Sequence, residues 1–339
     1  MKTEVVVNGR FLARRTTGVE RYAGEILRGL GAHGAQVQIA RPKRAAKSIS
    51  GHAWEQFFLP RRLSSRSTLW SPANSGPLLV SNQVLTLHDL TALEHPEWFK
   101  PAFTLWYRLL IPALVRRVKA IITPSEYVRQ KAIRRFGLPA WRVTVVSGGV
   151  DASRFHPAAK ITGAGRYVLF AGSLEPRKNL AGLIAAWNML AARHPDVRLV
   201  AAGGSGRVFR RLKIPAGLER VHFTGYVSDA ELAALYAGAE VFVFPSLDEG
   251  FGLPALEAMA CGAPVLASTR GALPEVIGDA GLFFDPADVA QLVGFLEQCL
   301  CDAHLRRSLA ARGLERASAF TWAKAAEKTW QVLKGNDAS

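Results

Sequence analysis

Two kinds of apolar pattern alternate along the chain. Short runs rich in β-branched residues, flanked by glycine, proline or polar residues, are typical of buried strands. Longer stretches with apolar residues every three or four positions are typical of helices that bury one face. Alternating strands and helices predict parallel sheets with helices on both faces. The expected strands are Glu4–Val7, Val84–Leu87, Ala120–Ile122, Val143–Val146, Tyr167–Phe170, Val197–Val200, Val221–Phe223, Val241–Phe244 and Pro264–Ala267, and the expected helices include Val19–Leu30, Leu180–Arg193, Ala230–Ala237, Leu253–Ala260 and Trp322–Leu333.

The length of the chain predicts more than one domain. It has 339 residues, more than a single hydrophobic core usually serves. Turn-forming residues at Asp151–Ala164 separate two strand–helix series and indicate a linker. The expected fold is therefore α/β, with two Rossmann-like doubly wound parallel sheets at 1–155 and 156–320 and a helix in 321–339 that packs back toward the first domain. Ligands of such sheets bind at the carboxyl ends of the strands, so we expect the ligand in a cleft between the domains.

Apolar runs and cysteines narrow the class of protein. No stretch approaches the roughly 20 apolar residues that span a bilayer, and the N-terminus lacks the apolar core of a signal peptide. A cytoplasmic location is expected. Cys261, Cys299 and Cys301 lack metal-ligand spacing and are interpreted as core or surface thiols.

Positive charge is concentrated in the first half of the chain. The net charge is +16, and residues 1–150 hold 23 Lys and Arg against 8 Asp and Glu, whereas residues 151–339 hold 20 against 19. Basic runs include Arg41–Arg44, Arg61-Arg62 and Arg116–Lys119. Such a one-sided domain predicts a polyanionic partner: nucleic acid, an anionic membrane surface or a phosphate-bearing substrate.

The segment Ser246–Gly262 carries the strongest chemical signal. Gly250 and Gly252 permit close approach of the backbone to a ligand, and Pro254 suits the first turn of a helix. The N–H groups at a helix start bind anions. Carboxylates at Glu249 and Glu257 can each accept a sugar diol, so the segment predicts a nucleotide-sugar pocket. By itself, Glu257 could also be an ordinary first-turn acid.

Three further features add candidate ligand contacts. Arg177 and Lys178 follow an expected strand and precede a helix capped by Asn179, where cations can neutralise a leaving diphosphate. Gly18 stands at a helix start and marks close approach to an anion. His88 ends an expected strand on its ligand side, although a structural histidine bonded within its own loop is as compatible with the sequence.

Some common motifs are absent from the sequence. There is no Walker-type glycine loop and no Gly-x-Gly-x-x-Gly after the first strand. No Asp-x-Asp occurs that would hold a catalytic metal beside a diphosphate, so we expect metal-independent chemistry with no cofactor.

Together these segments resemble the family 4 glycosyltransferases, retaining enzymes of the GT-B fold. The most specific match is Glu249–Glu257, with its glutamate pair, followed by Cys261–Ser268 and Gly271–Glu275. A subgroup rich in bacterial polysaccharide mannosyltransferases is resembled at four places. These are Asn8–Leu12, Thr17–Tyr22, Trp54–Gln56 with Leu59-Pro60, and His88–Leu90.

The resemblance implies roles for individual residues. Glu249 would contact the donor sugar and Glu257 the ribose, while Lys178 would hold the diphosphate. Further implied donor contacts are Gly18, Gly250, Phe251, Gly252 and Leu253, with base selection near Tyr226 and Val227. His88 would stabilise positive charge at the reacting carbon through its backbone or ring, so the expected catalytic set is His88, Arg177, Lys178 and Glu249.

Two positions depart from the family pattern. Ser173 stands where many members carry an arginine, and Arg177 is a candidate to replace it. Before the expected linker, Ser147–Asp151 differs from the common Pro-Asn-Gly-Val-Asp, so the hinge can differ as well.

The function implied is retaining transfer of a hexose in cell-surface polysaccharide biosynthesis. Mannose from GDP-mannose is favoured, and UDP-sugars or dTDP-rhamnose stay open as donors. No motif residue is a convincing nucleophile, which favours front-face attack over a covalent intermediate. A GT-B-like nucleotide-sugar epimerase and a non-catalytic nucleic-acid-binding protein are the alternatives.

The acceptor has to be read from the basic first half. A saccharide carried on a lipid diphosphate would bring negative charge and an anionic membrane surface with it. The apolar and basic stretch Pro101–Lys119 is either a membrane-facing helix or a core helix of the first domain. We expect a peripheral location on the inner face of the cytoplasmic membrane and no contact with nucleic acid.

Overall fold

The computed structural model describes residues 4–13, 16–32, 37–42, 48–157, 165–204, 209, 218 and 220–335. The chain divides into two compact units. Unit 1 comprises Met1–Glu94, Pro101–Gly149 and Thr321–Ser339, and unit 2 comprises His95–Lys100 and Val150–Phe320. The second half of the expected linker, from residue 158, and the basic residues Lys43 and Arg44 lie outside the described residues.

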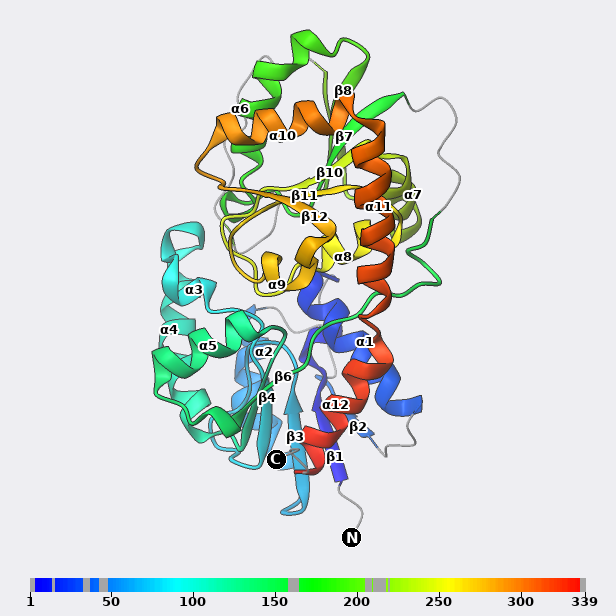
Figure 1. Ribbon diagram of the computed structural model, residues 1–339. Helices are drawn as coiled ribbons and strands as arrows, with labels where there is room; N and C mark the ends of the chain where they lie inside the picture. Colours follow the sequence, from blue (N-terminus) through cyan, green and yellow to red (C-terminus); the bar gives the residue numbers. More distant parts are fainter. Residues whose placement is uncertain are drawn as a thin grey trace. The chain divides into compact units, whose positions relative to one another are not determined.

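Each unit is built on a six-stranded sheet whose paired strands are all parallel (Figure 1). The strand order is β2-β1-β3-β4-β5-β6 in unit 1 and β12-β11-β10-β7-β8-β9 in unit 2. The strands of unit 1 are β1 (Glu4–Asn8), β2 (Val37–Ala40), β3 (Ser67–Ser71), β4 (Gln83–Thr86), β5 (Ala120–Thr123) and β6 (Val143–Val145). Those of unit 2 are β7 (Arg166–Ala171), β8 (Val197–Ala202), β9 (Val221–Gly225), β10 (Val241–Phe244), β11 (Val265–Ser268) and β12 (Gly281–Phe284).

Helices connect the strands in both units. Unit 1 contains α1 (Gly18–Ala32), α2 (Ser48–Ala53), α3 (Thr91–Glu94), α4 (Pro101–Arg117), α5 (Glu126–Phe136) and α12 (Trp322–Lys334). Unit 2 contains α6 (Leu180–Leu190), α7 (Asp229–Gly238), α8 (Leu253–Ala260), α9 (Leu273–Ile277), α10 (Val289–Cys301) and α11 (Ala303–Ser318). Shorter helical turns are η1 (Gly9–Ala13), η2 (Trp54–Phe58), η3 (Pro60–Arg62), η4 (Pro96–Trp98), η5 (Ala140–Arg142), η6 (Pro176–Lys178), η7 (Ala191–Arg193) and η8 (Gly278–Ala280).

In both sheets the strand order reverses at one point. The reversal lies between β1 and β3 in unit 1 and between β7 and β10 in unit 2. At such a point the connections leave in opposite directions and open a crevice outside the carboxyl ends of the two strands, where doubly wound proteins bind ligands. The topology therefore points to the loops after β1 and β3, and to those after β7 and β10.

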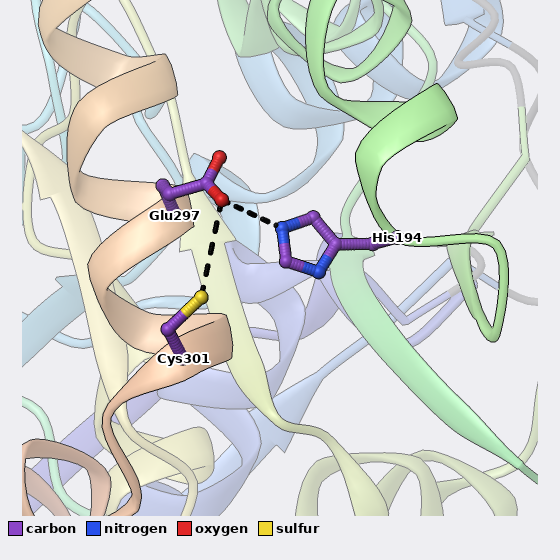
Figure 2. A group of neighbouring side chains, drawn as sticks. All are labelled: His194, Glu297 and Cys301. Atoms are coloured by element: carbon purple, nitrogen blue, oxygen red, sulfur yellow. Dashed lines mark hydrogen bonds and ion pairs between the residues drawn. The ribbon is translucent and has the colours of Figure 1, made fainter.

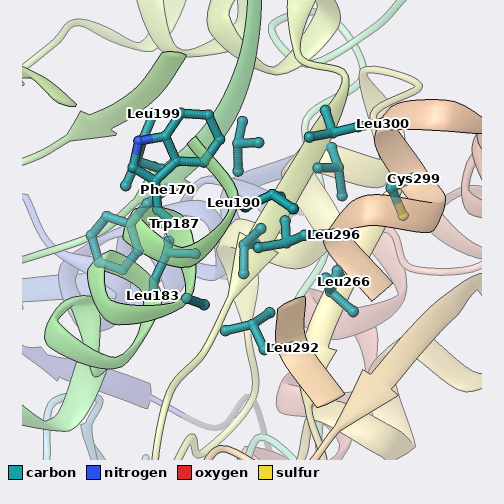
Figure 3. Packing of buried hydrophobic residues seen from close by; sticks show 14 of the residues in the cluster. Phe170, Leu183, Trp187, Leu190, Leu199, Leu266, Leu292, Leu296, Cys299 and Leu300 are labelled. Atoms are coloured by element: carbon teal, nitrogen blue, oxygen red, sulfur yellow. The ribbon is translucent and has the colours of Figure 1, made fainter. Parts of the chain in front are cut away.

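Each unit has its own hydrophobic core. In unit 2, α6 and α10 pack against each other and bury Trp187, Leu190, Leu292 and Leu296 over the sheet (Figure 3). In unit 1, α12 packs along α1, with Ala325, Val332 and Leu333 in the same buried cluster as strand residues such as Val5. Gly29 allows the two helices to approach closely, because a Cβ at this position would lie only 2.5 Å from the Ala326 Cβ.

The expected α/β class is confirmed, and every expected strand is present with small shifts at its ends. Three strands were missed. β2 and β3 mix polar and apolar residues, and β12 begins at a glycine, so none shows the β-branched run on which the prediction relied. The expected helix Leu180–Arg193 ends at Leu190 and closes with the turn η7. Within the described part of the chain, no helix is long and apolar enough to cross a membrane.

Candidate functional site

The candidate site in unit 2 lies where the strand order reverses. β7 pairs with β10, and both strands are fully buried apart from the first residue of β7. The chain leaves β7 through Gly172 and Ser173 into η6, and leaves β10 into the segment that precedes α8. Two neighbouring strands thus deliver Arg177 and Lys178 from one side and Glu249 from the other, as the sequence predicted for the carboxyl ends.

These three side chains form a buried ion-pair cluster. Lys178 Nζ donates to Glu249 Oε1 at 2.5 Å, and Arg177 Nη1 lies 2.8 Å from Glu249 Oε2. Arg177 also donates from Nη2 to Glu175 Oε1 at 2.9 Å. Both carboxylates and Lys178 are almost wholly buried, and the side chain of Arg177 is 14% exposed, so two cations and two anions balance one another with little contact with water. The cluster resists rearrangement, since breaking a buried pair leaves a charge without a partner.

The electrostatics of the cluster keep Glu249 ionised. Burial raises the pKa of this carboxyl, but the nearby charges of Arg177 and Lys178 outweigh burial and lower the pKa to about 2. For Lys178, burial dominates and lowers the pKa, although Glu249 acts in the opposite direction. The site therefore presents an ionised carboxylate that is bound to the buried side chain of Lys178.

Backbone contacts fix the position of Glu249. Leu247 N–H donates to the Arg177 carbonyl at 2.8 Å, and Ala272 N–H donates to the Glu249 carbonyl at 2.8 Å. Gly271 has a φ of 68°, and a Cβ there would lie 2.4 Å from the Glu249 nitrogen. Only glycine allows the loop after β11 to pass so close. The loops after β7, β10 and β11 are thus joined around one carboxylate.

Helix α8 begins where the sequence predicted. Its N-cap, Gly252, has a φ of 111°, and Pro254 stands in the first turn. The positive φ explains why glycine is needed, and proline suits this turn because the first N–H groups of a helix have no partner within it. Leu253 to Ala260 are buried apart from Pro254, and Glu257 is among the buried residues.

Ser173 lies in the loop that leads from β7 to η6, and the pair Tyr226-Val227 lies in the loop after β9, at the same edge of the sheet. Ser173 Oγ donates to Glu175 Oε2 at 2.8 Å. Ser173 is therefore linked through Glu175 to Arg177, the residue expected to replace the arginine that many family members carry at position 173. Tyr226 follows β9, and this residue is 62% exposed.

The two remaining candidates, His88 and Gly18, belong to unit 1. His88 follows β4 and is buried; its Nε2 donates to the Pro72 carbonyl at 2.7 Å, and its backbone N–H donates to Asn74 Oδ1 at 2.6 Å. Burial lowers the pKa of the imidazole. Gly18 begins α1. The structure thus joins Ser173, Arg177, Lys178 and Glu249 in one network of unit 2, and holds His88 by its own loop contacts in unit 1.

Sequence reasoning missed Glu175, which is fully buried between Ser173 and Arg177. The signal that could have revealed it is an acid two residues before an arginine in a loop after a buried strand. A surface glutamate gives the same pattern, so only its burial distinguishes it.

One group of described residues offers three metal-ligating side chains: His194, Glu297 and Cys301 (Figure 2). It lies before the amino end of β8, at the sheet edge opposite the candidate site. His194 Nε2 is 3.0 Å from Glu297 Oε1, and Arg193 Nη1 is 3.0 Å from Glu297 Oε2. Both oxygens of the glutamate therefore already lie at ion-pair distance from side chains of the protein. Cys301 is exposed, whereas Cys261 and Cys299 are buried, and all three are free of disulfide bonds.

Comparison with known sequences identifies the family. The family model described as "Glycosyl transferases group 1" matches residues 151–316, and "Glycosyltransferase Family 4" matches residues 63–154. The O-antigen chain mannosyltransferase B of Escherichia coli is 34% identical over 273 residues, which are 76% of this chain and 71% of that protein. This chain belongs to the group 1 glycosyltransferases of family 4.

Further relatives fit this glycosyltransferase. The serotype-specific mannosyltransferase WbdA of Escherichia coli is 37% identical over 263 residues, 72% of this chain but only 32% of that protein. The chain thus spans about a third of that relative's length. The solved sucrose-phosphate synthase from Thermosynechococcus elongatus superposes with a TM-score of 0.75 at 21% identity and covers 98% of each chain. This likeness shows the GT-B fold.

The family decides between the classes of function that the sequence left open. A hexosyltransferase is supported by the matched families and by relatives that are themselves glycosyltransferases. The epimerase and the nucleic-acid-binding alternatives are not supported by these relatives. The resemblance deduced from the Glu249–Glu257 segment is confirmed.

Proposed function

We propose that this glycosyltransferase moves mannose from GDP-mannose to a saccharide acceptor in cell-surface polysaccharide biosynthesis. The Arg177–Lys178–Glu249 cluster at the strand-order reversal carries the proposal. Its two cations suit a diphosphate, and its carboxylate can accept hydrogen bonds from the hydroxyl groups of a sugar. The sugar is taken from the relatives, since the O-antigen chain mannosyltransferase B and WbdA are both named as mannosyltransferases.

We assign the donor contacts residue by residue. Glu249 accepts hydrogen bonds from the donor hexose, and Glu257 accepts them from the ribose. The diphosphate lies against Lys178, Arg177 and the start of α8, where amides and the helix dipole favour an anion. The ionised state of Glu249 supports its part, because a carboxylate with a pKa of about 2 accepts hydrogen bonds at any physiological pH. The remaining assigned contacts are Gly18, Ser173, Tyr226, Val227, Gly250, Phe251, Gly252 and Leu253.

The reaction we propose retains the anomeric configuration. The glycosidic C–O bond to the diphosphate breaks, its electron pair leaves with the diphosphate, and the acceptor hydroxyl attacks from the same face. Positive charge develops at the anomeric carbon, where His88 acts. Its support is the fixed orientation of a neutral ring: with Nε2 donating to Pro72, Nδ1 keeps its lone pair. The proton of the acceptor passes to the leaving phosphate oxygen.

We further propose that transfer needs neither a metal nor a cofactor. The proposal gives the diphosphate two cationic partners, Arg177 and Lys178, and each can stabilise the charge that develops on it. The sequence contains no Asp-x-Asp to hold a divalent ion.

For the acceptor we propose a saccharide linked to a lipid diphosphate, reached at the anionic inner surface of the cytoplasmic membrane. Helix α4 supports a membrane contact, because it buries one face and exposes another. Tyr107 and Leu110 are buried, while Leu105 and Leu109 are 62% and 66% exposed. Arg108 lies between the two exposed leucines and is exposed as well. Helix α4 is thus a core helix whose outer face combines apolar and basic side chains, as interfacial helices do.

A nucleotide panel followed by a transfer assay tests the function. Thermal shifts are measured with GDP, UDP, dTDP and ADP, and we expect the largest rise in Tm with GDP. Transfer from GDP-mannose to a short mannose oligosaccharide is then measured with and without a chelator, and the anomer formed is read by NMR. We expect an α-linked product and the same rate in both samples.

Other outcomes would change the proposal in defined ways. A larger shift with UDP or dTDP would replace the donor, and loss of transfer with the chelator would overturn metal independence. A product of inverted configuration would overturn the mechanism, whereas no shift with any nucleotide would overturn the donor site.

A further inference from the structure

The loop that follows β3 in unit 1, Pro72–Leu78, is held on two sides by side chains from distant parts of the chain. It lies at the reversal of strand order between β1 and β3. One side contacts η2, and the other contacts His88.

A buried charge network holds the middle of this loop. Glu55 is completely buried in η2, and its Oε1 accepts from Asn8 Nδ2 at 2.6 Å and from Ser75 Oγ at 3.0 Å. Arg10 donates from Nη2 to Ser75 Oγ at 2.8 Å, and its Nε lies 3.5 Å from the same Glu55 oxygen. A loop serine is therefore fixed between an arginine and a glutamate, neither of which is accessible to solvent.

Gln56, next to Glu55 in the chain, forms two hydrogen bonds with the far end of the loop. Gln56 Nε2 donates to the Gly76 carbonyl at 2.9 Å, and Gln56 Oε1 accepts from the Leu78 N–H at 3.0 Å. One amide side chain therefore satisfies two backbone groups, as a neighbouring strand would. Glu55 and Gln56, which hold the loop, both belong to η2, a π-helix. This form occurs mostly as single turns and often at functional sites.

The near end of the loop holds His88. The Pro72 carbonyl accepts a hydrogen bond from His88 Nε2–H, which selects the ring tautomer, and Asn74 Oδ1 accepts a hydrogen bond from the backbone N–H of His88. Asn74 has a φ of 57°, so its backbone is left-handed. A residue in that conformation keeps its side chain in place only while its neighbours in the loop are fixed.

We infer that Arg10, Glu55 and Gln56 are positioning residues that set the tautomer and orientation of His88 through the loop Pro72–Leu78. The inference rests on the proposed function in one respect, because it gives His88 a part in the reaction. The transmission is physical and short: η2 fixes Ser75, Gly76 and Leu78, and the same loop carries the two groups that bind His88. Without the hydrogen bonds from η2 to the loop, the Pro72 carbonyl can move away from His88. The ring can then exchange its proton between the two nitrogens.

The test removes the hydrogen bonds from Gln56 to the loop, because Gln56 is the uncharged residue among the three positioning residues. Gln56→Leu keeps the size of the side chain and deletes both loop bonds, and Gln331→Leu, an exposed position on α12 of the same unit, serves as the control. Nitrogen NMR of histidine-labelled full-length protein reads the tautomer, with the His88 signals assigned from a His88→Asn sample. We expect one Nε2–H tautomer in the unaltered protein and in the control, and a mixture in Gln56→Leu.

Kinetics supply a second readout. Displacement of a catalytic group by about 1 Å can cost a hundredfold in rate, so we expect kcat of Gln56→Leu to fall about tenfold to a hundredfold while the KM for the donor stays within about twofold. Ser75→Ala, which removes the hydroxyl that joins the loop to Arg10 and Glu55, is the second variant and should give the same tautomer mixture. Circular dichroism and thermal melting establish which variants are folded.

Each outcome has a definite meaning. A single Nε2–H tautomer in both folded variants would overturn the inference, whatever their activity. Full turnover in His88→Asn would instead overturn the part of His88 in the proposed function. It would not affect the inference that the loop sets the tautomer of His88. A rise in donor KM with unchanged kcat would also overturn the inference, because it would place the effect on binding.

Discussion

At the scale of single residues, Glu249 is the centre of the ion-pair cluster in the candidate site. It is a buried acid, and such a group normally resists ionisation. Here two cations from the neighbouring loop reverse that tendency and lower its pKa to about 2. The carboxylate is therefore both a candidate ligand for the donor sugar and the ion-pair partner of Arg177 and Lys178 in a site with little exposure to water.

Glu249→Gln should lower both stability and activity. The folded pKa is about 2 and the ordinary value is 4.5, so ionised Glu249 stabilises the folded state fully above about pH 4.5 and loses this effect as the pH falls toward 2. The difference corresponds to about 3 kcal/mol in the free energy of unfolding at pH 7. We expect urea unfolding to show this loss at pH 7 and a smaller one below pH 4.5, together with a fall in kcat/KM of about a hundredfold or more.

Glu315→Gln is the matched control, because Glu315 is an exposed acid on α11 of the same unit. Its free energy of unfolding should stay within about 0.5 kcal/mol of the unaltered protein. A difference for Glu249→Gln that does not change between pH 7 and pH 4 would contradict the assigned ionisation.

At the scale of elements, the loops after the strands carry the chemistry and the helices determine what surrounds them. Helix α8 begins at a glycine in a left-handed conformation and buries almost its whole length. Helix α4, in contrast, is divided: one face belongs to the core, and the other exposes Leu105, Arg108 and Leu109. Phe57 and Phe58 of η2 are also exposed, at 61% and 59%.

The exposed face of α4 gives a prediction about membranes. Full-length protein should co-sediment with vesicles that contain anionic phospholipid at low salt, and Leu105→Ser with Leu109→Ser should reduce the bound fraction about tenfold, because each leucine loses apolar burial in the interface. High salt should weaken binding through the arginines.

Two controls separate the contributions. Leu314→Ser replaces a partly exposed leucine of α11 in unit 2 and should leave binding unchanged. Equal binding of the double variant and the unaltered protein would remove α4 as the membrane contact, and no binding to anionic vesicles at all would remove the proposed membrane partner.

At the scale of the whole molecule, the chain leaves unit 1 and returns to it at the end. Residues 321–339 belong to unit 1, and Ala325, Val332 and Leu333 of α12 lie in its core. The first unit therefore needs the last helix to complete its hydrophobic core.

A chain that ends at Phe320 should lose the stability of unit 1 and keep that of unit 2. Removal of α12 exposes the core face of α1, and the lost burial is worth more than about 5 kcal/mol, comparable with the stability of many domains. We expect scanning calorimetry to show one transition near its normal temperature, still raised by GDP, and the other lowered or absent. A chain that ends at Gly335 is the control, and equal transitions in both chains would contradict the dependence on α12.

Much of the fold could be predicted because its local signals agree. Strands such as β10 are short apolar runs, and α8 begins and ends at the residues that its proline and glycines indicate. β3 escaped prediction because its Ser, Thr and Trp give no apolar run, although all five residues are buried. The partners of a buried polar residue are set by the neighbouring strand, so Glu175 and the tie from Glu55 to Ser75 could not be read from local pattern.

The sequence by itself determined the α/β class and the family, and it singled out the segment Glu249–Glu257 as the candidate donor site, since these depend on residue type at fixed spacing. Only the tertiary structure decided which charges meet. Lys178 and Glu249 are far apart in the chain and bond at 2.5 Å because β7 and β10 are neighbours in the sheet. The same holds for His88, whose tautomer depends on a carbonyl that follows β3, because long-range pairing sets the electric field and the geometry of a buried group.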